Sequence, residues 1–153
     1  MKIAITGATG FIGRHVRNAF AKTEHDVVLV VRDAQKVGQI FAREEIVLAE
    51  LCQMETDWFE LLGKPDAVLH MAWGGLPNYM DNYHVDVELP MQARFLKAIV
   101  NSGLNKLVVT GTCYEYGLSS GALSENQETN PNTPYGVAKD TLRRELFNLQ
   151  SVK

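Results

Sequence analysis

The chain has 153 residues, 46% of them hydrophobic, which is enough for one compact domain with a core of its own. Its 15 basic and 18 acidic residues give a net charge of -3, and no basic run is long enough to follow a phosphate backbone. We therefore expect no nucleic-acid partner. The apolar run at residues 3–5 is too short for a signal or membrane segment, so we expect no membrane attachment and a cytoplasmic location.

Neither the cysteines nor the histidines are spaced like metal ligands. We expect Cys52 and Cys113 to be mainly buried thiols in a reducing compartment, with a packing role for Cys113 because no histidine is placed to activate it. His70 is expected to end a strand near a ligand rather than to bind a metal. The sequence therefore predicts no metal site.

Strand-like and helix-like segments alternate along the chain. Short runs rich in β-branched residues predict strands at residues 2–6, 26–32, 46–51, 67–71 and 106–110. Helical periodicity predicts helices at residues 11–22, 34–41, 57–62, 86–102 and 134–150, with a polar loop at 118–133. This alternation predicts a doubly wound parallel α/β sheet of the Rossmann type, with helices on both faces and ligands at the carboxyl ends of the strands.

Three local features refine the predicted helices. The first helix places Phe11, Ile12, Val16 and Phe20 on one face, which is expected to pack on the sheet. Gly103 is well placed to end the fourth helix, and proline at position 90 must lie in its first turn.

The glycines at positions 7, 10 and 13 directly follow the first strand and open the first helix. In this setting, glycines allow a sharp turn, a close approach of the backbone to a pyrophosphate, and tight packing of the helix on the strand. The free N–H groups at the start of the helix then face the phosphates. The turn therefore predicts a dinucleotide site.

The residue that ends the second strand distinguishes two forms of the cofactor. A carboxylate there binds a ribose 2'-hydroxyl, whereas an arginine accommodates a 2'-phosphate. Arg32 occupies this position, and Asp33 follows it and could compete for the ribose. The sequence favours NADP, with NAD as the alternative.

Tyr135 and Lys139 lie four residues apart at the start of the last helix, so both side chains leave the same face. A nearby ammonium favours the phenolate, which predicts a lowered pKa for Tyr135 and a role in proton transfer. Such a pair taken alone is usually a solvated surface pair, and its meaning depends on the other motifs.

Taken together, the motifs resemble those of the extended short-chain dehydrogenase/reductase family, over nearly the whole chain. They are Gly7-Ala8-Thr9-Gly10-Phe11-Ile12-Gly13, His70-Met71-Ala72, Thr110-Gly111-Thr112, Tyr116-Gly117 and Tyr135-Gly136-Val137-Ala138-Lys139. Within that family the chain is most similar to nucleotide-sugar epimerases, dehydratases and 4-ketoreductases. Residues 70–79 and 110–117 resemble more narrowly the reductases of nucleotide-linked 4-keto-6-deoxy sugars that are used for surface polysaccharides.

The resemblance implies roles for individual residues. Tyr135 would be the general acid/base, Lys139 its partner and a ligand of the nicotinamide ribose, and Thr112 a hydrogen-bond donor to the reacting oxygen. The implied cofactor site comprises Gly7, Thr9, Gly10, Phe11, Ile12, Gly13, Arg32, Glu50, Leu51, Met71, Ala72 and Lys139. For Glu50, a solvated carboxylate at a strand end is an equal alternative.

The chain departs from the family pattern in two ways. Glu88 stands where many relatives carry asparagine, which leaves the role of that position open. Relatives also continue well past the Tyr-Lys helix, so residues 1–153 are expected to be a dinucleotide-binding domain without its carboxy-terminal substrate domain. Such a chain is expected to be weakly active or inactive alone, and its exposed sheet is open to association between copies.

The predicted function is the NADP-dependent reduction of a nucleotide-linked 4-keto-6-deoxy sugar. A 4-epimerase or 4,6-dehydratase is the alternative, and the dehydratase is the less favoured of the two because Cys113-Tyr114-Glu115, rather than an Asp-Glu pair, follows Thr112. A non-catalytic module that senses NADP is the alternative from another class.

Overall fold

A computed structural model describes residues 1–53 and 56–151 of the chain. The chain divides into two compact units, which are described separately. Unit 1 comprises Met1–Ala72 and Ala98–Thr110, and unit 2 comprises Trp73–Lys97 and Gly111–Lys153. The helix α3 (Leu89–Asn101) begins in unit 2 and ends in unit 1.

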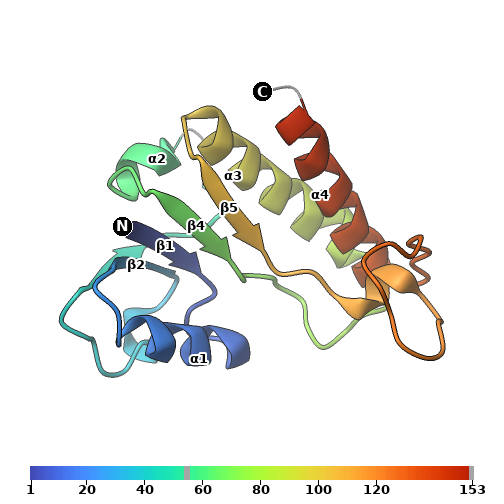
Figure 1. The fold of residues 1–153 in the computed structure, drawn as a ribbon, viewed down its shortest axis with the longest axis horizontal. Coiled ribbons are helices and arrows are strands. Elements are labelled where there is room, and N and C mark those ends of the chain that lie inside the picture. Colours follow the sequence, from blue (N-terminus) through green and yellow to red (C-terminus); the bar gives the residue numbers. More distant parts are fainter. Residues whose placement is uncertain (54–55, 152–153) are drawn as a thin grey trace. The chain divides into compact units, whose positions relative to one another are not determined.

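Unit 1 contains a five-stranded parallel sheet with the order β3-β2-β1-β4-β5 (Figure 1). Its strands are β1 (Lys2–Thr6), β2 (Asp26–Val31), β3 (Glu44–Leu48), β4 (Ala67–His70) and β5 (Lys106–Val109). The chain leaves the central strand β1 first toward β2 and β3, and later toward β4 and β5. This reversal is the doubly wound topology that the sequence predicts.

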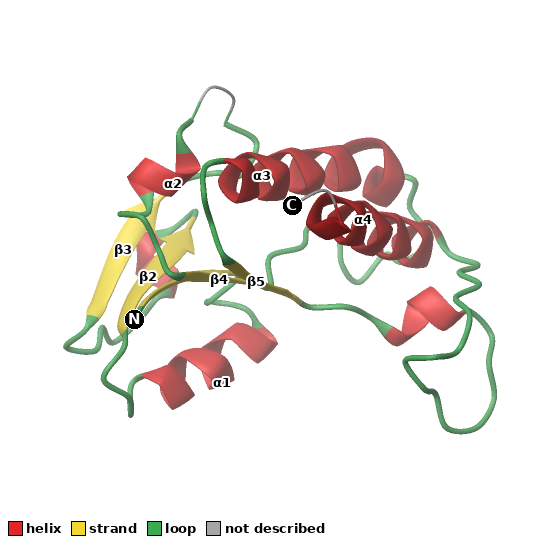
Figure 2. Cartoon of the chain, turned by 45° about the horizontal axis from the view of Figure 1, so that its top comes forward, coloured by secondary structure: helices red, strands yellow, loops and turns green. Residues whose placement is uncertain are grey.

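Two helices of unit 1, α1 (Phe11–Phe20) and α2 (Trp58–Leu61), lie on opposite faces of the sheet (Figure 2). The α1 side is a core of alternate β1 and β2 residues, against which Val16 and Phe20 of α1 pack. On α2, Trp58 is buried. Nearly every residue of β1 and β2 is buried, because successive side chains point to opposite faces of the sheet and both faces are covered. This explains why their hydrophobic runs are almost unbroken.

The predicted packing face of the first helix is partly wrong. Phe11 is 74% exposed and Ile12 is 57% exposed, whereas Gly13 and Arg17 are buried. Arg17 donates to both oxygens of the Glu44 carboxylate, each at 2.6 Å, and to the carbonyl oxygens of Val37 and Gln39. Hydrophobic periodicity does not predict a buried arginine on this face, because it is calculated from the positions of apolar residues only.

The segment after β2 also differs from the prediction. The predicted helix at residues 34–41 is a single 3-10 turn, Ala34–Lys36, which Asp33 caps by accepting a hydrogen bond from the Gln35 N–H. Gly38 follows with a φ of +69°, which interrupts a helix. β3 begins at Glu44 instead of residue 46, and it ends at Leu48, before Glu50 and Leu51.

The end of α3 confirms the predicted glycine cap. Gly103 has a φ of +113°, its N–H donates to the Val100 carbonyl, and the N–H of Leu104 donates to that of Ile99. This pattern is the Schellman motif, which needs a residue in the left-handed region.

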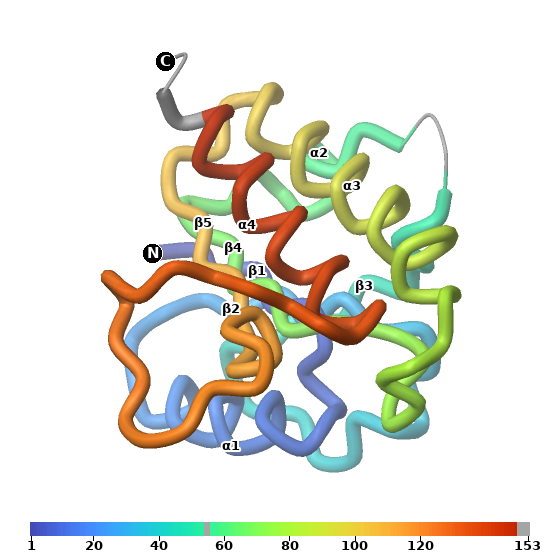
Figure 3. Tube along the Cα trace, turned by 90° about the vertical axis from the view of Figure 1, so that its right-hand side faces the viewer, coloured from blue at the N-terminus to red at the C-terminus, as the bar shows by residue number. Residues whose placement is uncertain are grey.

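In unit 2, a π-helical turn (His84–Glu88) runs directly into the start of α3. Pro90 is the second residue of α3, which agrees with the limit that the sequence sets. A 3-10 turn, η3 (Cys113–Tyr116), and the helix α4 (Pro134–Ser151) complete the unit, and both the π turn and η3 contact α4. Figure 3 shows α4 beside the first turns of α3, where Lys97 forms an ion pair with Glu145. None of the helices in the described parts of the chain combines the length and apolarity that crossing a bilayer requires.

Candidate cofactor and catalytic sites

Most residues of the predicted cofactor site follow the carboxyl ends of the strands in unit 1. The glycine turn follows β1, Arg32 follows β2, Glu50 and Leu51 follow β3, and Met71 and Ala72 follow β4. Since the strands are parallel, their carboxyl ends share one edge of the sheet, and the structure brings these residues to that edge. Lys139, the remaining predicted cofactor ligand, lies in unit 2.

The glycine turn contains two positions that the fold itself reserves for glycine. Gly7 has a φ of +74°, and a Cβ there would lie 2.7 Å from the backbone of Met71 and Ala72. A Cβ on Gly13 would lie 2.0 Å from the Gly7 carbonyl oxygen. Both positions are therefore structural requirements of the turn.

Gly10 differs from the other two. Its φ is -75° and its ψ is 179°, which any residue adopts, and a Cβ there would meet only the Gly7 oxygen, at 3.3 Å. The surrounding residues thus come close to tolerating a side chain at Gly10, which is exposed. Gly10 is also the N-cap of α1, where it has no side chain to bind the first N–H groups, and the first turn contains no acidic residue. A bare helix start with free N–H groups fits a pyrophosphate.

The end of β2 presents a cation. Arg32 is exposed, while the Asp33 carboxylate is engaged in capping the turn that follows. Beyond β3, Glu50 is exposed and contacts the Cys52 thiol, and Leu51 is half-buried. At the end of β4, the buried His70 pairs with the Thr6 hydroxyl, which also accepts from the N–H groups of Met71 and Ala72.

Unit 2 holds the three predicted catalytic residues. Tyr135 and Lys139 are both buried in the first turns of α4, which Thr133 caps by accepting from the Gly136 N–H. Thr112 precedes η3, and its hydroxyl hydrogen-bonds the Tyr135 phenol. Four aromatic rings have their centroids within 6 Å of the Tyr135 ring: those of Trp73, Tyr79, His84 and Tyr114. The Lys139 ammonium lies 4.6 Å from the centre of the Trp73 ring.

The predicted direction of the Tyr135 pKa is wrong. Burial raises the pKa of Tyr135 above its ordinary value, and the Thr112 hydrogen bond offsets this only in part. A neighbouring ammonium by itself favours the phenolate, but the desolvation of that phenolate among aromatic rings is the larger effect here.

The Lys139 pKa moves in the direction that burial dictates. Removal from water lowers the pKa of Lys139 to about 8, even though the carboxylates of Glu115 and Glu88 raise it. Lys139 is therefore a buried cation near neutral pH that loses its proton at mildly alkaline pH.

The segment after β4 is held by residues to which the sequence alone assigned no role. Glu88 is 1% exposed, and its carboxylate accepts from the Gly74 N–H at 2.6 Å, the Gln92 amide at 2.7 Å and the Tyr83 hydroxyl at 3.1 Å. The position that departs from the family pattern thus anchors the loop that carries Trp73. Its i, i+4 spacing with the polar residues His84 and Gln92, which are also buried, is the one sequence signal that could have indicated this.

His84 fixes the same loop from the π turn. Its Nδ1 lies 3.1 Å from the Trp73 indole nitrogen, whose N–H can only donate, so Nδ1 accepts. Nε2 therefore carries the proton and donates to the Asn78 carbonyl at 2.9 Å. The side chain is fully buried, and it serves as a bridge between Trp73 and Asn78.

The expectation for the two thiols is wrong, because Cys52 and Cys113 are both exposed. Each lies in a turn beyond a strand end, where the apolar pattern used to predict burial no longer applies. Among the described residues, no group of three or more His, Cys, Asp or Glu side chains could hold a metal ion.

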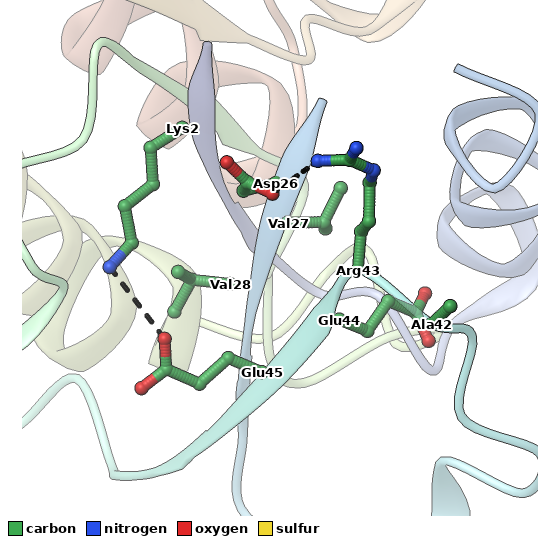
Figure 4. Close-up of a pocket in the computed structure, with 8 residues that line it drawn as sticks. All are labelled: Lys2, Asp26, Val27, Val28, Ala42, Arg43, Glu44 and Glu45. Carbon is green, nitrogen blue, oxygen red and sulfur yellow. Dashed lines mark hydrogen bonds and ion pairs between the residues drawn. The ribbon is translucent and has the colours of Figure 1, made fainter. Parts of the chain in front are cut away.

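A hollow in unit 1 lies at the opposite, amino-terminal edge of the sheet (Figure 4). Its charged residues form ion pairs: Arg43 with Glu24 and Asp26, and Lys2 with Glu45. It is lined by Lys2, Asp26, Val27, Val28, Ala42, Arg43, Glu44 and Glu45. These ion pairs give the charged residues of the hollow a structural role.

The chain is similar to enzymes that act on nucleotide-linked sugars. It is 29% identical over 153 residues to the dTDP-6-deoxy-L-talose 4-dehydrogenase (NAD(+)) of Aggregatibacter actinomycetemcomitans, a match that covers 99% of this chain and 56% of the relative. It is 27% identical over 155 residues to an uncharacterized UDP-glucose epimerase of Bacillus subtilis, covering 92% and 49%. A solved UDP-glucuronic acid 4-epimerase from Bacillus cereus, in complex with UDP-glucuronic acid and NAD, matches with a TM-score of 0.77 and 28% identity, covering 99% and 52%.

The chain thus spans about half the length of the relatives that it matches. The sequence profile of the family described as NAD dependent epimerase/dehydratase matches residues 3–151, nearly the whole chain. This match agrees with the doubly wound sheet and with the glycine turn at its carboxyl edge. The chain therefore belongs to the NAD dependent epimerase/dehydratase family.

Proposed function

We propose that residues 1–153 are the dinucleotide-binding part of a nucleotide-sugar oxidoreductase, and that its reaction is the reduction of a nucleotide-linked 4-keto-6-deoxy sugar. The observation that carries the proposal lies in unit 2, where the Thr112 hydroxyl bonds the Tyr135 phenol one helical turn from the buried ammonium of Lys139. A phenol, a hydroxyl and an ammonium in this arrangement can deliver a proton to a ketone oxygen.

Ketone reduction adds a hydride to carbon and a proton to oxygen. The nicotinamide, when bound, supplies the hydride. Tyr135 gives its phenolic proton to the sugar oxygen, Thr112 donates a hydrogen bond that orients this oxygen, and the Lys139 charge favours the phenolate that remains. The raised pKa of Tyr135 keeps it protonated at neutral pH, which is the form that a reductase needs before transfer.

Two relatives support this chemistry by the reactions for which they are named. The talose dehydrogenase is named for oxidation at the sugar 4-position, which is the reverse of a 4-ketone reduction. The Bacillus cereus relative is named as a 4-epimerase, and an epimerase needs the same proton transfer twice, so 4-epimerisation is the second candidate. The two reactions can be distinguished by the cofactor balance. A reductase consumes reduced cofactor, whereas an epimerase leaves the amount of reduced cofactor unchanged.

For the cofactor, we propose a preference for NADP, based on Arg32. The exposed guanidinium at the end of β2 is suited to a 2'-phosphate, and the Asp33 carboxylate is occupied by the Gln35 N–H. NAD is the second candidate, because the matched Bacillus cereus structure contains NAD. In fluorescence titrations we expect NADPH to bind more tightly than NADH, and Arg32→Ala to remove most of the difference. Equal affinity in the unmodified chain would assign NAD.

Turnover is best tested in a chimaera, because the relatives are about twice as long as this chain. Residues 1–153 joined to the second half of the talose dehydrogenase should oxidise NADPH or NADH with a dTDP-linked 4-keto-6-deoxy sugar. Tyr135→Phe should reduce the rate by about 10²–10⁴ while cofactor affinity stays within a few-fold. Full activity of this variant would contradict the proposal. Cofactor binding without turnover in any chimaera would favour a sensing module.

A further inference from the structure

The hydroxyl of Thr112 is held by its own backbone turn. Thr112 is the N-cap of η3, and its Oγ1 accepts a hydrogen bond from the Tyr114 N–H at 3.3 Å. A hydroxyl has one proton and two lone pairs, so a lone pair directed at the backbone leaves the proton free for another acceptor. The Tyr135 phenol is such a neighbour, and its interaction with the Thr112 hydroxyl lowers the Tyr135 pKa relative to burial alone.

Glu115 completes the turn as a capping box. Its Oε1 accepts from the Thr112 N–H at 2.8 Å, so Thr112 is fixed both through its side chain and through its backbone. Glu115 is 4% exposed, so its carboxylate depends on hydrogen-bond and ion-pair partners within the protein.

Arg143 of α4 supplies the ion pair. Its Nε lies 3.2 Å from the other oxygen of the Glu115 carboxylate. Arg143 is itself held by the Asp140 carboxylate at 2.6 Å, next to Lys139 in the sequence. A continuous chain of contacts therefore runs from Asp140 through Arg143 and Glu115 to Thr112.

Arg144 provides a comparison within the same network. It also donates to Asp140, at 2.7 Å, and like Arg143 it donates to the Thr129 hydroxyl. Arg143 in addition forms the ion pair with Glu115. The two arginines thus share their anchors and differ in their contact with the capping box.

We propose that Glu115 and Arg143 are positioning residues for Thr112, which they hold so that its hydroxyl lies beside the Tyr135 phenol. The inference rests on the proposed function, in which Thr112 and Tyr135 act on the sugar oxygen. Arg143 holds the Glu115 carboxylate in place through their ion pair, and Glu115 fixes the Thr112 backbone. The capping box thus fixes where the Thr112 hydroxyl lies.

The first test measures the hydrogen exchange of the Thr112 amide by NMR in the whole chain. We expect Arg143→Met to accelerate this exchange about tenfold, because the hydrogen bond to a charged acceptor is weakened. Arg144→Met, which loses the shared anchors only, should leave it within about twofold. Equal acceleration by the two variants would overturn the proposal, since it would assign the effect to Asp140 and Thr129.

The second test compares Glu115→Gln with Glu115→Met by following the Tyr135 ring carbon through its titration. Both variants remove the same charge, but only glutamine keeps an acceptor for the Thr112 N–H. We expect a higher Tyr135 pKa in the methionine variant, where the Thr112 hydroxyl is no longer held beside the phenol. Identical values would overturn the proposal. Neither readout uses cofactor or sugar, so a failure of the proposed function would appear separately, as a loss of binding or turnover.

Discussion

The glycine turn of unit 1 and the tyrosine cluster of unit 2 achieve their chemistry in opposite ways. The turn offers backbone N–H groups at the uncapped start of α1, and it depends on glycines because a side chain at Gly7 or Gly13 would clash with the backbone. The cluster depends on ionisable side chains that are buried among aromatic rings and anchored by Glu88, Glu115 and His84. A backbone site depends on shape, whereas a site of buried ionisable groups also depends on pH. Each unit should therefore respond to a different kind of perturbation.

The largest expected effect separates two glycines of the same turn. Gly13→Val places a side chain where a Cβ would be 2.0 Å from the Gly7 oxygen, so the turn must open. We expect the free energy of unfolding to fall by about 3 kcal/mol, as measured by urea denaturation. A change below about 1 kcal/mol would mean that the turn is more adaptable than its geometry indicates.

Gly10→Val is the matched variant. Its Cβ meets only one oxygen, at 3.3 Å, so stability should change by less than about 1 kcal/mol. Dinucleotide binding, followed by calorimetry, should weaken at least about 100-fold because the side chain fills the space of the pyrophosphate. Unchanged binding by a folded Gly10→Val protein would make the turn a structural feature only.

The next effect tests whether unit 2 is governed by pH. The folded-state pKa of Lys139 is about 8, against an ordinary value of 10.5. Between these values the unfolded chain binds the proton and the folded chain does not, so stability due to Lys139 rises with pH. The burial cost is fully present below about pH 8. Relative to Lys139→Met, the unmodified chain should therefore gain about 2–3 kcal/mol from about pH 7 to about pH 10.

Parallel pH profiles for the two proteins, measured by denaturant unfolding, would contradict this expectation. Ionisation of Tyr135 sets the upper limit of the pH range in which this effect of Lys139 can be measured. Its pKa is raised in the folded state, so above about pH 10 the unfolded chain loses the phenolic proton first and stability falls. The comparison with Lys139→Met cancels this contribution, because Tyr135 is present in both proteins.

The smallest effect concerns the Glu88 anchor. Tyr83→Phe removes one donor to the carboxylate, at 3.1 Å, and leaves those of Gly74 and Gln92 in place. Tyr83 is 37% exposed, so water can replace its hydroxyl. We expect a loss of about 1 kcal/mol in thermal unfolding and no change in dinucleotide affinity. A weaker dinucleotide affinity would show that the Glu88 anchor influences the glycine turn. The two sites would then not respond independently to perturbation.

The sheet could be predicted from the sequence because its residues obey simple local rules. Parallel strands covered on both faces are continuous apolar runs, and the glycine turn and the Gly103 cap each require a particular backbone geometry. The capping box at Thr112 could also have been found, since Thr112 and Glu115 have the spacing of that motif. Its partner Arg143 could not, because the contact joins two segments that are distant in sequence.

The same reason explains the errors. The pKa of Tyr135 depends on rings contributed by separate segments of the chain, and no spacing rule reports how much water they exclude. The burial of Arg17 depends on Glu44, which is 27 residues away. Contacts between segments distant in the sequence decided both points, and periodicity does not report such contacts.

The buried pair of Arg17 and Glu44 constrains how this chain can vary. Replacement of Arg17 alone would strand a carboxylate and the carbonyl oxygens of Val37 and Gln39 without their donor. Replacement of Glu44 alone would strand a guanidinium. Such single steps typically cost about 3–5 kcal/mol, whereas replacing both partners with apolar residues of similar volume is often neutral. Among natural variants, positions 17 and 44 should therefore change together, so that substitutions at one are accompanied by substitutions at the other.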